Sequence, residues 1–434
     1  MKGHISVIAR RTSRLQQQQY RFGRSHRRSA NATDYDVVIA GGGPAGTSAA
    51  IHLARRGLRV QLVEQKKFPR AKLCGEFISP ECVMHFERLG LVDRVLEAGG
   101  AHLKQTVFYS RSGRSINVPS EWFGSAQTYA LGLSRAEMDQ RLMMRAREVG
   151  VDVLEESQAI GLKLEDGRVR GVSLRQAGRQ LSVTSLLAVD ATGRSRALAR
   201  CAETQGKTQR PAIHSRPTLV AFKAHLENAS GARDQCEIYS YRGGYGGLNP
   251  IENGLSNICF IVKSRDVRAS GNDADRVMRE VLMTNPRAAQ TLASARVRGG
   301  WLAVSLGEFG RKPMVPVAGL LSIGDAASFI DPFTGSGMLM ALESGELAAH
   351  TIARHIARLR EDGSFDAIAS DYTVRYRQLF GARLRVCYLM RGAAFIPRFA
   401  ESLIFALGAS VRARRYLARA TRRQERTKPK LDAG

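Results

Sequence analysis

Tyr35-Asp36-Val37-Val38-Ile39-Ala40-Gly41-Gly42-Gly43-Pro44-Ala45-Gly46 places an apolar, β-branched run directly before a cluster of glycines. Such a run is typical of a parallel strand that is buried on both faces. We expect a helix from Thr47 to Arg56, with Gly57 as its stop. A second β-type run, Arg59–Val63, follows and ends at Glu64. The order of strand, glycines, helix and strand is typical of a dinucleotide-binding α/β fold.

Each glycine of this stretch has a separate physical task. Gly41 permits the tight turn, Gly43 lets the backbone approach a pyrophosphate, and Gly46 lets the helix pack closely on the strand. The helix N-terminus offers unpaired N–H groups and partial positive charge to phosphates. Glu64, eighteen residues after Gly46, can accept hydrogen bonds from ribose hydroxyls. Together with Ala45, these residues predict a dinucleotide site.

Three further stretches repeat the pattern of a strand or loop that leads into a helix or turn. Ser134 and Glu137 predict a capping box, followed by a helix that runs to about Val149. Two apolar runs predict strands: Leu186–Gly193 ends in a glycine turn, and Leu320–Ala327 contains Asp325 after its apolar residues. The stretch Asp331-Pro332-Phe333-Thr334-Gly335-Ser336-Gly337 then leads into a long helix from Met338 to about Arg358.

This set of motifs resembles the FAD-dependent oxidoreductase superfamily of aromatic hydroxylases, geranylgeranyl reductases and flavin-dependent halogenases, over about residues 34–350. The resemblance implies that Asp325 binds the ribityl–pyrophosphate region of FAD and that Arg135 lies near its pyrophosphate and adenine end. It also implies that the helix start from Gly335 to Gly337 lies beside the isoalloxazine ring. A helix N-terminus there can stabilise negative charge on a reduced flavin. No second GxGxxG follows a strand, so the sequence indicates no separate nicotinamide-nucleotide domain. The resemblance implies that NAD(P)H docks transiently as the reductant.

The resemblance predicts an α/β fold, with a Rossmann-type, glutathione reductase-like FAD-binding domain and an inserted antiparallel-sheet substrate domain. The predicted parts are a basic extension (1–33), a discontinuous FAD-binding domain (34–80, 131–200 and 310–352), a substrate domain (81–130 and 201–309), C-terminal helices (353–410) and a basic tail (411–434).

Local signals inside these parts predict particular elements. Asp166-Gly167 lies between two alternating runs and predicts a hairpin. In the second insertion we expect antiparallel strands at Phe222–Leu226, Glu237–Tyr241 and Ile258–Val262, with a turn at Gly243–Gly247. An apolar stripe on the C-terminal helices predicts either packing on the core or a lipid-facing surface flanked by arginine. Its residues are Leu384, Val386, Leu389, Phe395, Phe399, Leu403, Ile404 and Leu407.

The reaction is harder to infer than the cofactor, because the flavin carries the redox step. Cys74-Gly75 after the ribose acid resembles the geranylgeranyl-reductase branch, and Cys74 and Glu76 are the candidate catalytic residues at the isoalloxazine face. Ala191-Thr192-Gly193 and Ser328 depart from the hydroxylase motifs. The reductases' aromatic motif is only partly present, at residues 244–250, without a tryptophan.

The prediction is therefore NAD(P)H-dependent reduction of a C=C bond in an apolar small molecule. The alternative is a monooxygenase that hydroxylates or epoxidises an aromatic, polyketide or isoprenoid substrate. Halogenation needs a tunnel lysine, for which Lys104 is the candidate, but the halogenase tryptophan motif is missing. A basic nucleic-acid- or membrane-binding protein is the remaining interpretation, and it rests on the charge of the two ends alone.

Composition and charge limit the partners. The net charge is +27, and residues 1–30 hold eight Lys or Arg without an acid, while residues 411–434 contribute +7. Such ends can bind polyanions or anionic lipid. Six scattered cysteines form neither a disulfide framework nor a zinc pattern, so we expect no metal and a cytoplasmic location. We expect no nucleic acid, allow peripheral membrane contact, and leave the oligomeric state open.

Overall fold

The computed structural model describes residues 33–123, 125–205, 218–307, 309–331, 335–394 and 397–420. The predictions for the extension up to residue 32, for Pro332-Phe333-Thr334 and for the tail beyond residue 420 lie outside the described residues. The same holds for the side chains of Phe395, Phe399 and Leu403. No helix within the described part of the chain is long and apolar enough to cross a membrane.

A five-stranded parallel sheet forms the centre of the nucleotide-binding part. Its order is β8-β2-β1-β11-β18. These strands are β1 (Tyr35–Ala40), β2 (Val60–Val63), β8 (Asp152–Leu154), β11 (Arg179–Asp190) and β18 (Leu320–Ser322). The first half of β11 continues into an antiparallel meander with β9 (Ser157–Glu165) and β10 (Arg168–Gln176). Asp166 and Gly167 both have positive φ at the β9–β10 turn, so the predicted hairpin is confirmed.

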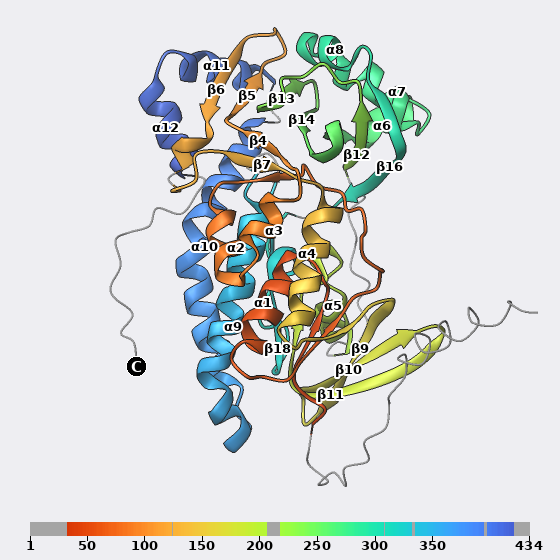
Figure 1. The fold of residues 1–434 in the computed structure, drawn as a ribbon, viewed down its shortest axis with the longest axis vertical. Coiled ribbons are helices and arrows are strands. Elements are labelled where there is room, and N and C mark those ends of the chain that lie inside the picture. The colour runs from red at the N-terminus through yellow and green to blue at the C-terminus, as the bar shows by residue number, and fades with distance from the viewer. Residues whose placement is uncertain are drawn as a thin grey trace, which may run out of the picture. The chain divides into compact units, whose positions relative to one another are not determined.

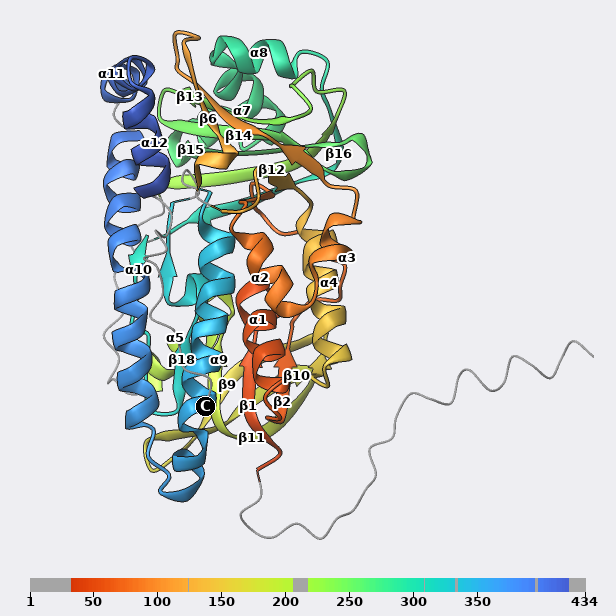
Figure 2. The same ribbon diagram turned by 60° about the vertical axis from the view of Figure 1, so that its left-hand side comes forward.

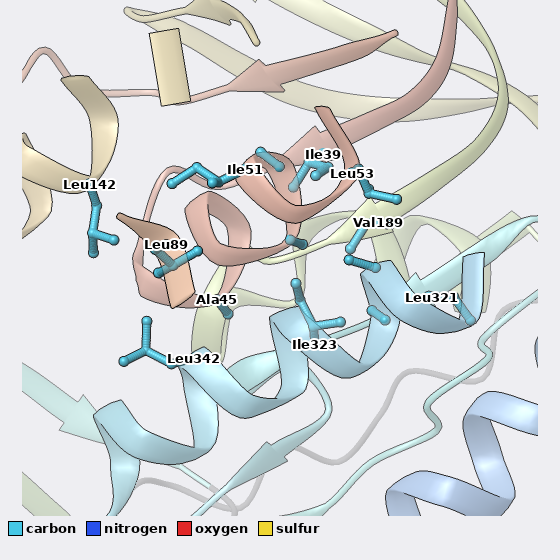
Figure 3. Close-up of a cluster of buried hydrophobic side chains, with 14 of the residues drawn as sticks. Ile39, Ala45, Ile51, Leu53, Leu89, Leu142, Val189, Leu321, Ile323 and Leu342 are labelled. Carbon is cyan, nitrogen blue, oxygen red and sulfur yellow. The ribbon is translucent and has the colours of Figure 1, made fainter. Parts of the chain in front are cut away.

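Both faces of the parallel sheet are buried, as the continuous apolar run of β1 predicts. Val37 and Ile39 face one hydrophobic cluster, and Val38 and Ala40 face another. The first cluster holds residues of α1 (Pro44–Ala54), α4 (Arg135–Glu148) and α9 (Gly337–Glu361) (Figure 3). The second holds residues of the meander and of α5 (Ala197–Gln205). This burial holds β1 and the glycine loop after it in place.

The two helices of the nucleotide-binding motif differ slightly from expectation. Helix α1 begins at Pro44, three residues before the predicted start, because Pro44 fits the first helical position with Gly43 as N-cap. At α4 the Ser134 side chain accepts a hydrogen bond from the Glu137 N–H, as predicted. The reciprocal bond is absent: Ser134 N–H donates to Glu252, and Glu137 pairs with Arg141 instead. The predicted capping box is therefore only half formed.

A seven-stranded sheet with the order β16-β12-β15-β14-β13-β5-β6 forms the second layer (Figure 1). All pairs are antiparallel except β13 with β5. Its strands are β5 (Gln105–Tyr109), β6 (Ser115–Pro119), β12 (Leu219–Glu227), β13 (Gln235–Tyr241), β14 (Gly244–Pro250), β15 (Ser256–Lys263) and β16 (Arg296–Leu306). Helices α6 (Ser264–Ala269), α7 (Ala274–Glu280) and α8 (Pro286–Leu292) lie between β15 and β16 in the chain.

The prediction of a turn at Gly243–Gly247 was wrong. Only Gly243 lies in the turn, and Gly244 begins β14 in the middle of the sheet. A Cβ on Gly244 would lie 1.9 Å from the carbonyl oxygen of Ile261 on β15. Glycine at this position therefore serves a close approach of strands, which local sequence cannot distinguish from a turn.

The segment 81–130 divides between the two layers. Helices α2 (Cys82–Leu89) and α3 (Val92–Leu96) contribute to the cluster that holds α1 and α9. Strands β5 and β6 join the seven-stranded sheet, and η1 (Ser120–Phe123) follows β6. A small sheet of β3 (Phe77–Ile78), β7 (Ala130–Gly132) and β4 (Ala101–Leu103) also includes residues of this segment.

The C-terminal part is helical. Helix α10 (Asp366–Ala394) runs alongside α9 (Figure 2), and α11 (Pro397–Gly408) and α12 (Val411–Ala420) return to the seven-stranded sheet beside β6 (Figure 1). The first ten residues of the predicted basic tail are thus a helix. A short β17 (Gly310–Arg311) pairs with β19 (Ser328–Phe329) near η5 (Gly324–Ala326).

Candidate FAD and substrate site

A cavity of about 660 Å³ extends from the glycine loop after β1 to the C-terminal helices α11 and α12. Every residue that the sequence assigned to FAD binding or to catalysis of a reduction lines this cavity, except Gly46. They are Gly41, Gly43, Ala45, Glu64, Cys74, Glu76, Arg135, Asp325, Gly335 and Gly337. These residues come from six separate stretches of the chain, and the carboxyl ends of the parallel strands bring them together.

The glycine loop has the geometry that a bound pyrophosphate requires. Gly41 has a φ of +109°, and a Cβ there would lie 2.3 Å from the carbonyl oxygen of Ala191. A Cβ on Gly46 would lie 1.9 Å from the carbonyl oxygen of Gly41, so the helix packs directly on the turn. At Gly43 the nearest atom to such a Cβ is Nη2 of Arg135, at 3.8 Å. Gly43 thus opens onto the cavity, where the backbone N–H groups of α1 can face phosphate oxygens.

Glu64 lies at the end of β2, where the motif requires an acid. Its carboxylate accepts hydrogen bonds from the backbone N–H of Gly42 at 2.9 Å and of Lys66 at 3.0 Å. These bonds hold the side chain against the glycine loop. A carboxylate has about four lone-pair positions, so it can still accept hydrogen bonds from ribose hydroxyls.

Besides Lys66, four cations line the same part of the cavity, and sequence reasoning identified only one of them. They are Arg70, Lys72, Arg135 and Arg194. Asp139 pairs with Arg135 at 2.7 Å and with Arg70 at 3.3 Å. Lys72 is an exposed residue, but partial desolvation at the cavity lowers the pKa of its ammonium, and the charges of Arg70, Arg135 and Arg194 lower it further. A bound pyrophosphate would relieve this repulsion, so the donor set fits FAD. The position of the missed residues in the sequence could have identified them, because each lies next to a motif of the site. Arg70 and Lys72 precede Cys74, and Arg194 follows the glycine turn.

Asp325 and the start of α9 also line the cavity. Burial raises the pKa of the Asp325 carboxyl, and the charges of Arg194, Arg135 and Lys72 oppose that rise. Gly335 and Gly337 line the cavity at the N-terminus of α9, a helix of 25 residues. The positive end of the helix dipole therefore faces the cavity at this point. The Asp325 carboxyl group could accept hydrogen bonds from hydroxyl groups of a bound FAD. The N-terminus of α9 could stabilise negative charge on the same cofactor.

Cys74 lies at the junction between the two layers. Its carbonyl accepts a hydrogen bond from Asn257 Nδ2 at 3.2 Å, and its Sγ accepts one from the Glu76 N–H at 3.4 Å. The Cys74 thiol also interacts with Arg135 and with Cys259. Cys74 therefore contacts both Arg135, one of the cations of the cavity, and residues of the seven-stranded sheet.

Glu76 is fully buried and belongs to an ion cluster. Its carboxylate accepts hydrogen bonds from His225 Nε2 at 2.7 Å, from Lys223 Nζ, and from the Arg135 backbone N–H at 2.8 Å. Burial alone would raise the pKa of Glu76, but His225 and Lys223 hold it below its usual range. Both carboxylate oxygens are engaged by protein donors, so the geometry gives Glu76 a positioning role. Sequence reasoning missed Lys223 and His225, which lie on β12 and bear no local signature.

Tyr245 is a further cavity residue that the sequence did not single out. Its hydroxyl donates a hydrogen bond to the carboxylate of Asp331, six residues before α9 begins at Gly337. The residue lies on β14, in the stretch that was predicted as a turn. Tyr245 thus lines the cavity and is hydrogen-bonded to a residue shortly before α9, the helix whose start the resemblance assigns to the isoalloxazine ring.

The far end of the cavity is mostly apolar, with Arg414 as a cationic residue in its lining. Residues of β5, β6, β13, α11 and α12 line it, namely Phe108, Ile116, Val118, Ile238, Ile404, Leu407 and Leu417. The stripe residues Ile404 and Leu407 thus face the cavity, whereas Leu389 is exposed. Lys104, the candidate tunnel lysine, is an exposed residue that pairs with Asp234 at 3.7 Å. It lies outside this cavity lining.

Relatives of known activity match most of the chain. A menaquinone reductase of Mycobacterium tuberculosis is 28% identical over 384 residues, which cover 83% of this chain and 85% of the relative. Digeranylgeranylglycerophospholipid reductase 1 of Methanococcoides burtonii is 26% identical over 356 residues, which cover 80% of each chain.

Solved structures share the fold. A geranylgeranyl bacteriochlorophyll reductase-like protein from Thermoplasma acidophilum superposes with a TM-score of 0.71 at 21% identity, covering 88% of this chain and 95% of the other. A flavin-dependent brominase superposes with a TM-score of 0.73 at 22% identity, covering 89% and 95%. The FAD binding domain family matches residues 34–373. The chain therefore belongs to the FAD binding domain family and is an FAD-dependent oxidoreductase.

Proposed function

We propose that this oxidoreductase reduces a carbon–carbon double bond in a long apolar substrate, with NAD(P)H as the reductant. The observation that carries the proposal is the shape of the cavity. One end is cationic and glycine-rich, the other is apolar, and Cys74 lies between them. A site of this kind can bind a dinucleotide at one end and bury a hydrocarbon chain at the other.

The curated relatives support a lipid-like substrate. Their names specify a menaquinone and a digeranylgeranylglycerophospholipid as the molecules that they reduce. Both molecules carry polyisoprenoid chains, whose double bonds are isolated in an apolar environment. The apolar end of the cavity, between the strands β5 and β13 and the helices α11 and α12, suits such a chain.

Saturation of a double bond adds a hydride to one carbon and a proton to the other. FAD, when bound, supplies the hydride after NAD(P)H has reduced it. The chain supplies the rest: the apolar wall excludes water and orients the substrate, and the Cys74 Sγ–H holds the proton for the second carbon. Glu76, tied to Lys223 and His225, holds the 74–76 backbone against β12. Positioning of this kind lowers the barrier by removing the cost of orientation.

The test uses the purified full chain loaded with FAD, a geranylgeranyl lipid dispersed in detergent, and NADPH or NADH, under argon. We expect oxidation of the reduced nicotinamide and a product heavier by two hydrogens for each bond reduced. A product that carries one extra oxygen and forms only in air would establish the monooxygenase instead. Ile404→Glu, in the apolar wall, should raise KM strongly while leaving flavin reduction intact. Leu181→Glu on the meander, outside the cavity lining, is the matched control.

A further inference from the structure

The two helices that close the apolar end of the cavity have very different inner and outer sides. Ile404 and Leu407 of α11 and Leu417 and Ala418 of α12 line the cavity. Arg414 of α12 donates hydrogen bonds to the carbonyl and side-chain oxygens of Asn117 on β6, at 3.0 and 2.8 Å. The inner side thus anchors both helices to the seven-stranded sheet (Figure 1).

Large apolar side chains lie on the outer side of the same helices. Phe405 of α11 is 67% exposed, and Val411 and Tyr416 of α12 are 52% and 70% exposed. Tyr388 and Leu389, near the end of α10, are also exposed. We call Phe405, Val411 and Tyr416 the outer patch. Exposed aromatic residues on adjoining helices are unusual for a surface that meets only water.

The charge on α12, which carries Val411 and Tyr416, has one sign. Helix α12 contains four arginines and no acidic residue in ten positions. Arg412, Arg415 and Arg419 are exposed among the apolar side chains, and Arg415 lies over the ring of Trp122 at 5.3 Å. A short helix with arginine on the outside and Tyr and Phe beside it is typical of an element that lies in the interface of an anionic bilayer.

We propose that the outer patch docks this enzyme on the surface of an anionic phospholipid bilayer and that α11 and α12 form the portal between the bilayer and the cavity. The occupant follows from charge complementarity, since anionic headgroups attract arginine while Phe405 and Tyr416 enter the boundary of the acyl chains. The inner sides of the same helices line the apolar end of the cavity. A lipid chain that leaves the bilayer therefore has only one layer of helices to pass before it enters the cavity. The proposal rests on the proposed function for the identity of this cargo, but docking itself can be measured without turnover.

The decisive experiment measures the depth of one side chain in the bilayer. Tyr416→Trp is mixed with vesicles of phosphatidylcholine and phosphatidylglycerol, with either normal or brominated acyl chains. Wild type supplies the baseline from Trp122 and Trp301. Leu181→Trp, which replaces a side chain that is 43% exposed on β11 in the meander, is the matched control. We expect bromine to quench Tyr416→Trp beyond the wild-type level and to add no quenching to Leu181→Trp. Equal quenching in both variants, or none in either, would overturn the proposal.

A second measurement separates docking from attraction by the basic ends of the chain. Co-sedimentation in about 0.5 M salt weakens purely electrostatic binding. There, the double variant Phe405→Ser/Tyr416→Ser should bind the same vesicles at least about tenfold more weakly than wild type. Leu181→Ser should bind like wild type, and all proteins should keep the flavin spectrum. Unchanged binding of the double variant would contradict the proposal. So would light scattering that shows a dimer which the double variant dissociates, since the patch would then be a contact between two copies.

Discussion

The Glu76 carboxylate accepts a hydrogen bond from His225 Nε2 at 2.7 Å, although the two residues are 149 positions apart. Lys223, two residues earlier on the same strand, donates to the other carboxylate oxygen. Because Glu76 also accepts from the backbone N–H of Arg135, the cluster joins the loop after β2, the start of α4 and the seven-stranded sheet. The cavity lies where these three parts meet.

Removal of the Glu76 charge should destabilise the protein. Glu76→Gln leaves the Lys223 ammonium buried without a carboxylate, which costs about 3–5 kcal/mol of unfolding free energy. Lys223→Met in the same background should recover at least about 1 kcal/mol, because the uncompensated charge is gone. Urea unfolding of the two single variants and the double variant measures this coupling. Strictly additive losses would show that the two charges do not depend on each other.

Gly43→Val should abolish FAD binding without unfolding the protein. Among the described residues other than its chain neighbours, none has an atom nearer than 3.8 Å to a Cβ at Gly43, so the new side chain would enter the space that the pyrophosphate would occupy. Gly300→Val on β16, where a Cβ meets nothing within 4 Å, is the control and should keep the flavin. Flavin absorbance of the purified proteins and their thermal midpoints provide the two readings. A yellow Gly43→Val protein with normal affinity would place the pyrophosphate elsewhere.

Cys74→Ser should separate flavin reduction from substrate reduction. The substituted side chain is nearly the same size but far less acidic than a thiol, so proton delivery to the substrate should fail while FAD and NAD(P)H still react. Stopped-flow reduction of the flavin should stay within about twofold of wild type, and product formation should fall by about 10²-fold or more. Cys201→Ser on α5, outside the cavity lining, should do neither. Wild-type turnover by Cys74→Ser would exclude this thiol as the proton donor.

Mild acid should destabilise the protein through His52. Burial on α1 lowers the pKa of His52 to about 4, against the opposing charge of Glu346. Since the pKa is about 6.5 in the unfolded chain, the stabilisation is complete above that pH and is lost as the pH falls from 6.5 through 4. The loss should approach about 3 kcal/mol. Urea unfolding of wild type and His52→Gln at pH values from 7.5 to 4.5 tests this, since the variant should show a flatter decline. Identical slopes would rule out His52 as the group responsible.

Local patterns were sufficient for the nucleotide half of the molecule. The apolar run of β1, the glycines, Pro44 and Glu64 act through contacts that are close in sequence, and the hairpin at Asp166-Gly167 is equally local. Each obeys a rule of backbone geometry that a short window contains. The resemblance added Arg135, Asp325 and the start of α9, and the structure brings all of them to one cavity.

Other residues of the site could not be predicted, because their roles depend on contacts with residues that are far away in the sequence. The sequence around Gly244 is typical of a turn. In the structure a glycine is needed there because the backbone of Ile261 on the neighbouring strand leaves no room for a side chain. Lys223 and His225 look like ordinary strand residues until Glu76 is placed beside them. Arg194 looks like a surface arginine after a glycine turn until it is found in the cavity wall with Lys72.

The sequence alone determined the cofactor class and the α/β core, because turn geometry and strand burial depend on residues that are consecutive in the chain. Only the tertiary structure decided which charges are buried together and which side of α11 and α12 faces the cavity. Strand register and helix packing bring residues such as Glu76 and His225 within hydrogen-bond distance, and pairings across 149 positions leave no periodic trace in the chain. The packing of strands and helices therefore decides which charged residues meet in the site and which residues line the apolar end of the cavity.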